Sequence, residues 1–389
     1  MTKIQDHINL GIAFSQTHRY TEAIREFEIA LKIDPKEVKA HFELGIIYAN
    51  TGEYDKAIVE YEEILKEEPE HVNTLCKLGL IFMNTGRLDE AVIKFQAALG
   101  VNQTDSGLHN NLGDVYYRQG DLSAAKQAYQ KALDINPRLS EVNFKLGYIL
   151  ETEGQYEEAL VAYQTTLQIN PRHAAVYDIV AGLNLKLGRE KEAEQAYYKA
   201  LNVNPKDIIS LQNLGKLLFK SQRLEEAIKY LQKALEINPM NNEVHIQLGQ
   251  SYSQLGRREE AIEEFRQVLA ANPKDVNLHK TMALMYEQET LLDEALKEYQ
   301  LALEINIQDL SIKLGMANLL YRRTEYESAL KVFKEILEAD KNVTEAYLKI
   351  GNIYYKQNNK KLAIEFWEQA LALDPSNEIL RNNIKFVKG

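Results

Sequence analysis

Small, large and helix-breaking residues recur along this chain with a period of 34 residues. Alanine stands at eleven positions with this spacing, from Ala23 to Ala363, and a glycine or alanine stands twelve residues before each of them. The position four residues after each alanine is aromatic in ten of the eleven cases, as at Phe27. Small side chains let two helices approach closely, and a large ring fills the space that they leave. The pattern therefore predicts closely packed pairs of helices.

The residues that end helices follow the same period. All eight prolines, from Pro35 to Pro375, fall twelve residues after the alanine, where proline ends one helix and admits the next. Six glycines, from Gly52 to Gly256, occupy the position between the two helices of a unit, where a left-handed turn is needed. Each unit therefore reads as helix, tight turn, helix, tight turn. Residues 99–107 lack the proline and contain two glycines, so we expect a hinge there.

The second unit carries the full pattern. Its residues are His41, Leu44, Gly45, Tyr48, Ala57, Tyr61, Ile64 and Pro69. With this pattern the chain resembles the tetratricopeptide repeat family, which implies an all-α fold, a right-handed superhelical α-solenoid of tandem helix-turn-helix repeats. The resemblance divides residues 1–377 into eleven repeats, namely 4–37, 38–71, 72–105, 106–139, 140–173, 174–207, 208–241, 242–275, 276–309, 310–343 and 344–377. Residues 376–389 have apolar residues at helical spacing and are expected to form a C-terminal capping helix.

The composition of the chain opposes several classes of function. A net charge of -11 and a pI near 5.4 oppose binding to nucleic acid or to an anionic membrane. Cys76 is the only cysteine, so neither an internal disulfide nor a cysteine-based zinc site can form. No apolar run reaches eighteen residues and no secretion signal is recognisable, so we expect a cytoplasmic protein without membrane insertion.

The candidates for chemistry are few. Five of the eight histidines, including His41 and His109, share one packing position of the repeat, so a packing and capping role is favoured over metal binding. Phosphate-binding loops, dinucleotide-binding motifs and metalloprotease motifs are absent from the sequence. We therefore expect no enzyme activity, no metal and no cofactor.

The resemblance implies a concave groove lined by the first helix of each repeat, and two groups of residues there are candidate partner contacts. The apolar group consists of Ile8, Ile12, Phe42, Ile46, Leu80, Met83, Phe144 and Tyr148. Such a group suits an amphipathic helix or an apolar peptide. Tighter internal packing near an uncapped end, or self-association through it, explains the apolar group equally well.

The second group repeats a polar residue, an aromatic ring and a base, a combination that suits a carboxylate or phosphate. Its members are Asp114, Tyr117 and Arg118, then Lys216, Phe219 and Lys220, then Asn318, Tyr321 and Arg322, and finally Asn352, Tyr355 and Lys356. Asn111 matches the asparagine ladder of glycosyltransferase-linked arrays, although residues such as Glu43 interrupt that ladder. The alternative for these bases is that their long stems cover apolar surface.

These observations favour a protein-interaction scaffold that binds a peptide or helix of partner proteins in the concave groove, with assembly of its partners as the role. Two alternatives stay open. One is a structural scaffold that self-associates into head-to-tail homo-oligomers. The other is a regulatory subunit of a separate enzyme.

Overall fold

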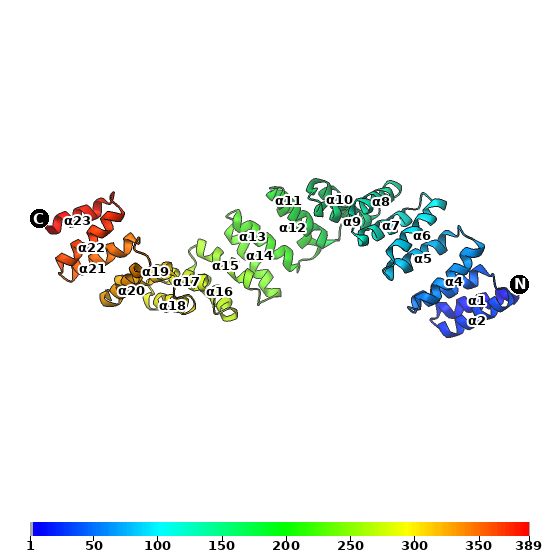
Figure 1. Ribbon diagram of the computed structural model, residues 1–389, viewed down its shortest axis with the longest axis horizontal. Coiled ribbons are helices and arrows are strands. Elements are labelled where there is room, and N and C mark those ends of the chain that lie inside the picture. The colour runs from blue at the N-terminus through cyan, green and yellow to red at the C-terminus, as the bar shows by residue number, and fades with distance from the viewer. Residues whose placement is uncertain (1–2, 389) are drawn as a thin grey trace. The chain divides into compact units, whose positions relative to one another are not determined.

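The computed structural model describes residues 3–388, which form helices joined by short turns and contain no strand (Figure 1). The chain divides into two compact units, of which the first ends at Pro205 and the second begins at Lys206. The first unit contains α1 (Lys3–Gln16), α2 (Tyr20–Ile33), α3 (Val38–Asn50), α4 (Tyr54–Glu67), α5 (Val72–Asn84), α6 (Leu88–Val101), α7 (Ser106–Gln119), α8 (Leu122–Ile135), α9 (Ser140–Thr152), α10 (Tyr156–Ile169), α11 (Ala174–Lys186) and α12 (Glu190–Val203).

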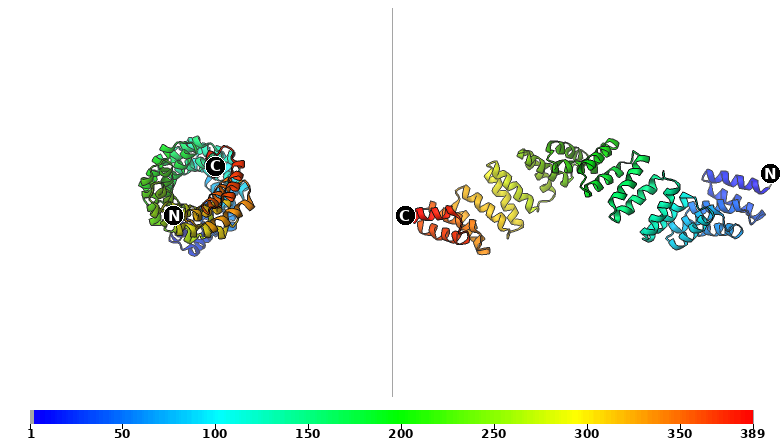
Figure 2. Two further views of the ribbon diagram at one scale, coloured as in Figure 1. Left: turned by 90° about the vertical axis from the view of Figure 1, so that its left-hand side faces the viewer. Right: turned by 90° about the horizontal axis from the view of Figure 1, so that it is seen from above.

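The second unit is built in the same way. It contains α13 (Ile208–Lys220), α14 (Leu224–Ile237), α15 (Asn242–Gln254), α16 (Arg258–Ala271), α17 (Val276–Gln288), α18 (Leu292–Ile305), α19 (Leu310–Arg322), α20 (Tyr326–Ala339), α21 (Thr344–Lys356), α22 (Lys360–Leu373) and α23 (Glu378–Lys388). Within each unit the helix pairs follow one another in chain order (Figure 2). Each helix packs mainly against its neighbours in sequence. The predicted all-α solenoid is confirmed.

The core of each helix pair is the predicted match of small and large residues. Alanines such as Ala57 and rings such as Tyr61 are fully buried. A Cβ atom added to Gly79 of α5 would stand 2.7 Å from Cε1 of Phe95 in α6, closer than two carbon atoms normally approach. The ring of the second helix thus occupies the space beside Gly79, so only a small residue fits at this position without movement of the ring or the helix.

The turn inside each pair has the predicted left-handed conformation. Gly120 has a φ of 81°, and the other five glycines at this position are similar. Where no glycine is present, residues such as Thr290 and Thr324 adopt the same conformation, with φ of 60° and 65°. A β-branched residue is strained there because its Cβ approaches the following carbonyl oxygen. The packing of the two helices thus determines the turn even where the sequence opposes it.

The hinge expected at residues 99–107 does not coincide with the division between the compact units. Gly100 lies inside α6, and Gly107 lies in the first turn of α7. The carboxylate of Asp105 caps α7 by accepting hydrogen bonds from the backbone N–H groups of Gly107 and Leu108, at 2.8 and 3.1 Å. This cap begins α7 without a proline, and Asp207 and Asp275 cap α13 and α17 in the same way.

The histidines of the packing position serve as hydrogen-bonded packing groups. In His41 the ring Nδ1 lies 2.6 Å from a carboxylate oxygen of Glu60, and Nε2 lies 3.0 Å from the carbonyl oxygen of Pro35. His109 lacks such a carboxylate, and its buried Nδ1 has no hydrogen-bond partner within the described part of the chain. Among residues 3–388, no three His, Cys, Asp or Glu side chains are grouped closely enough to hold a metal ion.

Candidate functional site

Three consecutive helices of the first unit, α7, α8 and α9, line an open cavity of about 290 Å³. We call this the aromatic pocket, and it is lined by Asp114, Tyr117, Tyr129, Phe144, Lys145 and Tyr148. Three of these residues, Tyr117, Phe144 and Tyr148, are candidate contacts from the sequence. The structure therefore brings Asp114 and Tyr117 of the second group together with two members of the apolar group.

The floor of the aromatic pocket follows from the packing rule of the repeat. Gly113 of α7 carries no side chain, so the ring of Tyr129 from α8 can lie against the α7 backbone. The Tyr129 hydroxyl donates a hydrogen bond of 2.6 Å to the carboxylate of Asp114. Burial raises the pKa of Tyr129 well above its usual range, and the neighbouring Asp114 raises it further. Tyr129 is thus a neutral, fixed wall of the pocket.

One charge pair lies beside this floor. The ammonium of Lys145 in α9 contacts both carboxylate oxygens of Asp114, at 2.9 and 3.0 Å. The same ammonium lies 3.3 Å from the side-chain oxygen of Asn110 and 3.2 Å from a carboxylate oxygen of Glu141. Because Asp114 and Lys145 are about three-quarters buried, the pair is screened less than an exposed one. The charges satisfy each other and leave the aromatic walls as the accessible surface.

The rim of the pocket is aromatic and open. Tyr117 and Tyr148 keep 41% and 45% of their surface exposed, although each is a large ring. Their ring centroids lie 6.3 Å apart in an edge-to-face arrangement. Phe144 is held from behind by Tyr163, at a centroid distance of 5.6 Å, and by the stacked ring of His173. The rings are therefore preorganised around an opening that can accept a large apolar side chain.

The remaining apolar candidates lie nearer to the core than the sequence suggested. Ile8 and Met83 are wrong as partner contacts, because only 1% and 8% of their surface is exposed. Ile8 belongs to the core because α1 packs against both α2 and α3. Met83 lies at the end of α5, where the guanidinium of Arg118 donates a hydrogen bond to its carbonyl oxygen. The other four candidates of this group are half-buried, namely Ile12, Phe42, Ile46 and Leu80.

Several of the candidate polar groups already have partners within the chain. Arg322 forms an ion pair of 2.6 Å with Glu287 of the preceding repeat. Lys216 lies 3.7 Å from Glu243. Asn111 contacts the sulfur of Cys76, Asn318 donates to Glu345, and Asn352 accepts from Trp367. Phe219 is half-buried, and Lys220 is exposed. An acidic ligand would have to compete with these internal contacts at Arg322 and Lys216.

The last candidates gather at a second cavity, of about 270 Å³, between α19, α21, α22 and α23. Tyr321, Tyr355 and Lys356 line it, and Asn352 forms part of its wall. The Lys356 ammonium lies 5.4 Å from the ring centroid of Tyr321 and 3.2 Å from the hydroxyl of Tyr326. This base thus lies over Tyr321 of the preceding repeat, whereas the sequence pattern paired it with Tyr355 of its own repeat.

Sequence reasoning did not select Tyr129 or Lys145 as site residues. Tyr129 occupies the ring position that the repeat uses for its core, so it gave no signal of a surface site. Lys145 stands at an inward-facing position of the first helix, and Asp114 stands 31 residues before it. That offset, slightly less than one repeat, is the signal that would have revealed the pair.

No helix within residues 3–388 is long and apolar enough to cross a bilayer. Residues 72–275, more than half of the chain, match the family model described as the cilia and flagella-associated protein 70 C-terminal domain. Residues 8–71, 246–309 and 344–377 match tetratricopeptide repeat models. No curated protein matches the chain.

Solved structures of similar fold include a crystal structure of the MamA protein, with 27% identity over 43% of this chain and 92% of that chain, at a TM-score of 0.41. Another is YrrB, described as a TPR protein with an unusual peptide-binding site, with 24% identity over 49% of this chain and 99% of that chain, at a TM-score of 0.43. Proteins built from such repeats are scaffolds for protein interactions and are generally non-catalytic. This chain belongs to the tetratricopeptide repeat family.

Proposed function

We propose that the chain binds a peptide segment of a partner protein on the face of the first unit where α7 and α9 present the aromatic pocket. The observation that carries this proposal is the pair of half-exposed rings of Tyr117 and Tyr148 around a cavity of about 290 Å³. Rings fixed around a cavity lose little side-chain entropy on binding, and such pockets provide most of the affinity at protein interfaces.

The chemistry of the pocket favours a large apolar or aromatic side chain of the ligand. Asp114 and Lys145 neutralise each other, so a charged group entering the pocket would lose solvation without gaining a free partner. In the second unit, we propose that the ammonium of Lys356, which lies over the ring of Tyr321, receives a carboxylate of an acidic peptide.

The whole array of repeats also has a proposed role. We propose that residues 4–377 form eleven tandem repeats capped by α23, and that the array assembles partner proteins in the cytoplasm without catalysing a reaction. The capping helix predicted for residues 376–389 extends to Gly389, which lies outside the described residues. Because each repeat contacts mainly its neighbours, different repeats can hold different partner segments independently.

The test uses a peptide selected from a random library for binding to the intact chain. Its affinity is measured for the wild type, for Tyr148→Ala and for Val161→Ala, a control that truncates an exposed apolar side chain of α10. We expect Tyr148→Ala to weaken binding by about thirtyfold, as for the loss of an interface hot spot, and Val161→Ala to have no effect. Equal affinities of the wild type and Tyr148→Ala would refute the site.

A second candidate function is self-association through α23. This helix exposes 70% of Ile379 and 78% of Phe386, which is unusual for large apolar side chains so close together. If they contact another copy, the solution mass measured by light scattering rises with concentration, and the double change of Ile379→Ser and Phe386→Ser restores a monomer. A mass of one chain at every concentration would exclude this function.

A further inference from the structure

One position of the repeat carries a large side chain in every repeat except one. It lies in the first helix, three residues after the glycine or alanine of the 34-residue pattern. Its occupants are Phe14, Tyr48, Phe82, Tyr116, Leu150, Asn184, Leu218, Tyr252, Tyr286, Leu320 and Tyr354. Asn184 is the one small polar residue among them. At Tyr116, Tyr252 and Tyr286 the side chain reaches from the first helix of its own repeat to the second helix of the preceding repeat.

Tyr252 shows how the protein holds a ring at this position. Its hydroxyl accepts a hydrogen bond of 2.9 Å from the side-chain amide of Gln232 in the preceding repeat. The guanidinium of Arg257 stacks over its ring, 4.6 Å from the centroid, and lies 3.7 Å from the carboxylate of Glu225. The ring is therefore bound by one donor at its hydroxyl and by one cation at its face.

Other repeats use the same two contacts. Gln96 donates to the hydroxyl of Tyr116 at 3.1 Å, and Arg266 donates to that of Tyr286 at 2.9 Å. Arginines also stack on the rings of Phe14 and Phe82, at 4.5 and 4.3 Å from the centroids. The donor or the cation thus recurs at this position in several repeats, and Tyr252 has both.

At Asn184 the ring is missing, but the residues that correspond to the partners of Tyr252 are present. Gln164, Arg189 and Glu157 stand 68 residues, or two repeats, before Gln232, Arg257 and Glu225. The guanidinium of Arg189 is held by Glu157 at 2.6 and 2.8 Å, which matches the pairing of Arg257 with Glu225.

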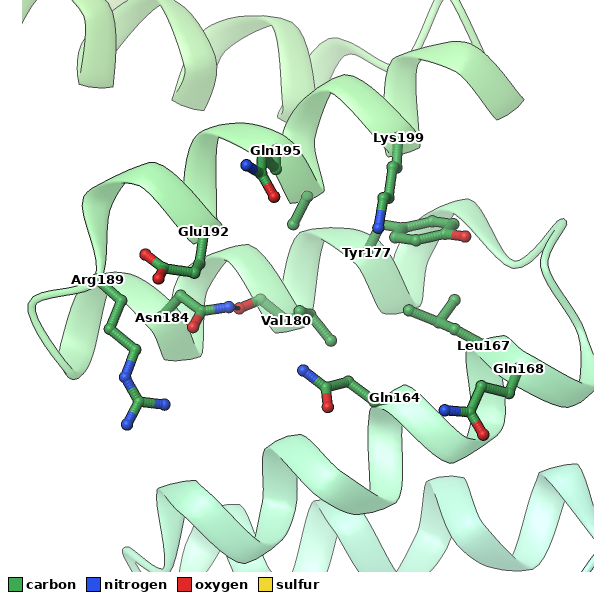
Figure 3. A pocket seen from close by; sticks show the side chains of 11 residues that line it. Gln164, Leu167, Gln168, Tyr177, Val180, Asn184, Arg189, Glu192, Gln195 and Lys199 are labelled. Atoms are coloured by element: carbon green, nitrogen blue, oxygen red, sulfur yellow. Dashed lines mark hydrogen bonds between the residues drawn. The ribbon is translucent and has the colours of Figure 1, made fainter.

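A cavity of about 520 Å³ lies at this place, with Gln164 and Arg189 in its lining. Asn184 is buried and uses its amide N–H on the carbonyl oxygen of Val180, at 2.8 Å, so it does not fill the space. Figure 3 shows Gln164 extending beneath Val180 and Asn184, with Arg189 at the edge. The cavity opens between the second helices α10 and α12, and α11 forms its floor.

We propose that this cavity, which we call the vacant ring site, binds a tyrosyl side chain of a partner polypeptide. The guest ring takes the place that Tyr252 occupies two repeats later, with its hydroxyl at Gln164 and its face at Arg189. A phenylalanine ring would leave the amide of Gln164 unused, and an aliphatic side chain would also forgo the stacking on Arg189. The vacant ring site does not share a residue with the aromatic pocket, so this inference does not rest on the proposed function.

The test uses N-acetyl-L-tyrosinamide and N-acetyl-L-phenylalaninamide as probes. Binding of each probe to the full chain is monitored by NMR. We expect the tyrosine probe to shift the resonances of Gln164, Asn184 and Arg189 with a dissociation constant of about 1 mM, the range that small fragments reach. The phenylalanine probe should bind about fivefold more weakly because one neutral hydrogen bond is lost.

Three variants separate this site from non-specific binding. Gln164→Leu is expected to abolish the preference for the tyrosine probe, whereas Gln130→Leu, which changes the matching position one repeat earlier, should preserve it. Asn184→Tyr supplies the ring from within, so it should abolish probe binding and raise the melting temperature. Equal shifts with both probes on the wild type, or probe binding that survives Asn184→Tyr, would overturn the proposal.

Discussion

The replacement of Gly79 by alanine tests the packing rule on which the whole fold depends. The added methyl group would stand 2.7, 2.8 and 2.9 Å from three ring atoms of Phe95. Carbon atoms in contact are normally about 3.5–4.0 Å apart, so the ring or the helix has to move by roughly 1 Å. Phe95 is fully buried, so the ring cannot move into solvent.

Two opposing terms set the size of the effect. Overpacking a core of this kind costs about 1–3 kcal/mol. Alanine is a better helix former than glycine by about 1 kcal/mol, which offsets part of that cost. We therefore expect Gly79→Ala to lower the local stability of α5 and α6 by about 1 kcal/mol, which makes their amide hydrogens exchange about fivefold faster.

Gly182 of α11 is the matched control. It also lies inside a first helix, but an added Cβ would have no atom of a neighbouring group within 4 Å. Gly182→Ala should therefore stabilise its repeat by about 1 kcal/mol through helix propensity alone. Hydrogen exchange monitored by mass spectrometry resolves the two sites in the intact chain. If both variants exchanged more slowly than the wild type, close packing of ring against glycine would not limit the approach of the helices.

Three further predictions concern one strained turn and two buried histidines. Thr290→Gly should raise the melting temperature by the equivalent of about 1 kcal/mol, because it removes the left-handed strain at φ 60°; an unchanged melt would refute that strain. The hydrogen bond to Glu60 raises the pKa of His41 above its ordinary value of 6.5, although burial opposes this. The pair therefore stabilises the fold fully below about pH 6.5. This contribution is lost as the pH rises through the raised pKa of His41. Urea unfolding at several pH values should show this dependence in the wild type and lose it in Glu60→Gln. Ala128→Glu should give the buried Nδ1 of His109 a carboxylate and stabilise the protein by about 1 kcal/mol; a lower unfolding midpoint would contradict this.

The fold could be predicted from the sequence because a short-range pattern recurs in every repeat. The glycine of the first helix and the ring of the second are spaced to meet within one helix pair, as Gly79 and Phe95 show, so spacing alone predicted their contact. The left-handed turns were predicted for the same reason. The turn at Thr290 is an exception in sequence but not in structure, because packing of the flanking helices outweighs its local preference.

The candidate site was less predictable because it depends on contacts between repeats. Arg322 was selected as a ligand contact, but Glu287, 35 residues earlier, already pairs with it. Ile8 was placed on a groove, but it is buried in the core that α1 forms with its neighbouring helices. The pairing of Arg322 and the burial of Ile8 both depend on side chains of neighbouring helices. Asn184 is the converse case, since the one small polar residue at the aligned position of the repeats marks a cavity.

The most direct test of the proposed binding face is photo-crosslinking of the selected peptide. A photoreactive benzoylphenylalanine is introduced in place of Tyr117 at the rim of the aromatic pocket, and in a second variant in place of Val161 on α10. The proposed function predicts that the peptide is captured from position 117 and not from position 161. Capture from 161 but not from 117 would contradict it, since the partner would then bind a different surface of the first unit.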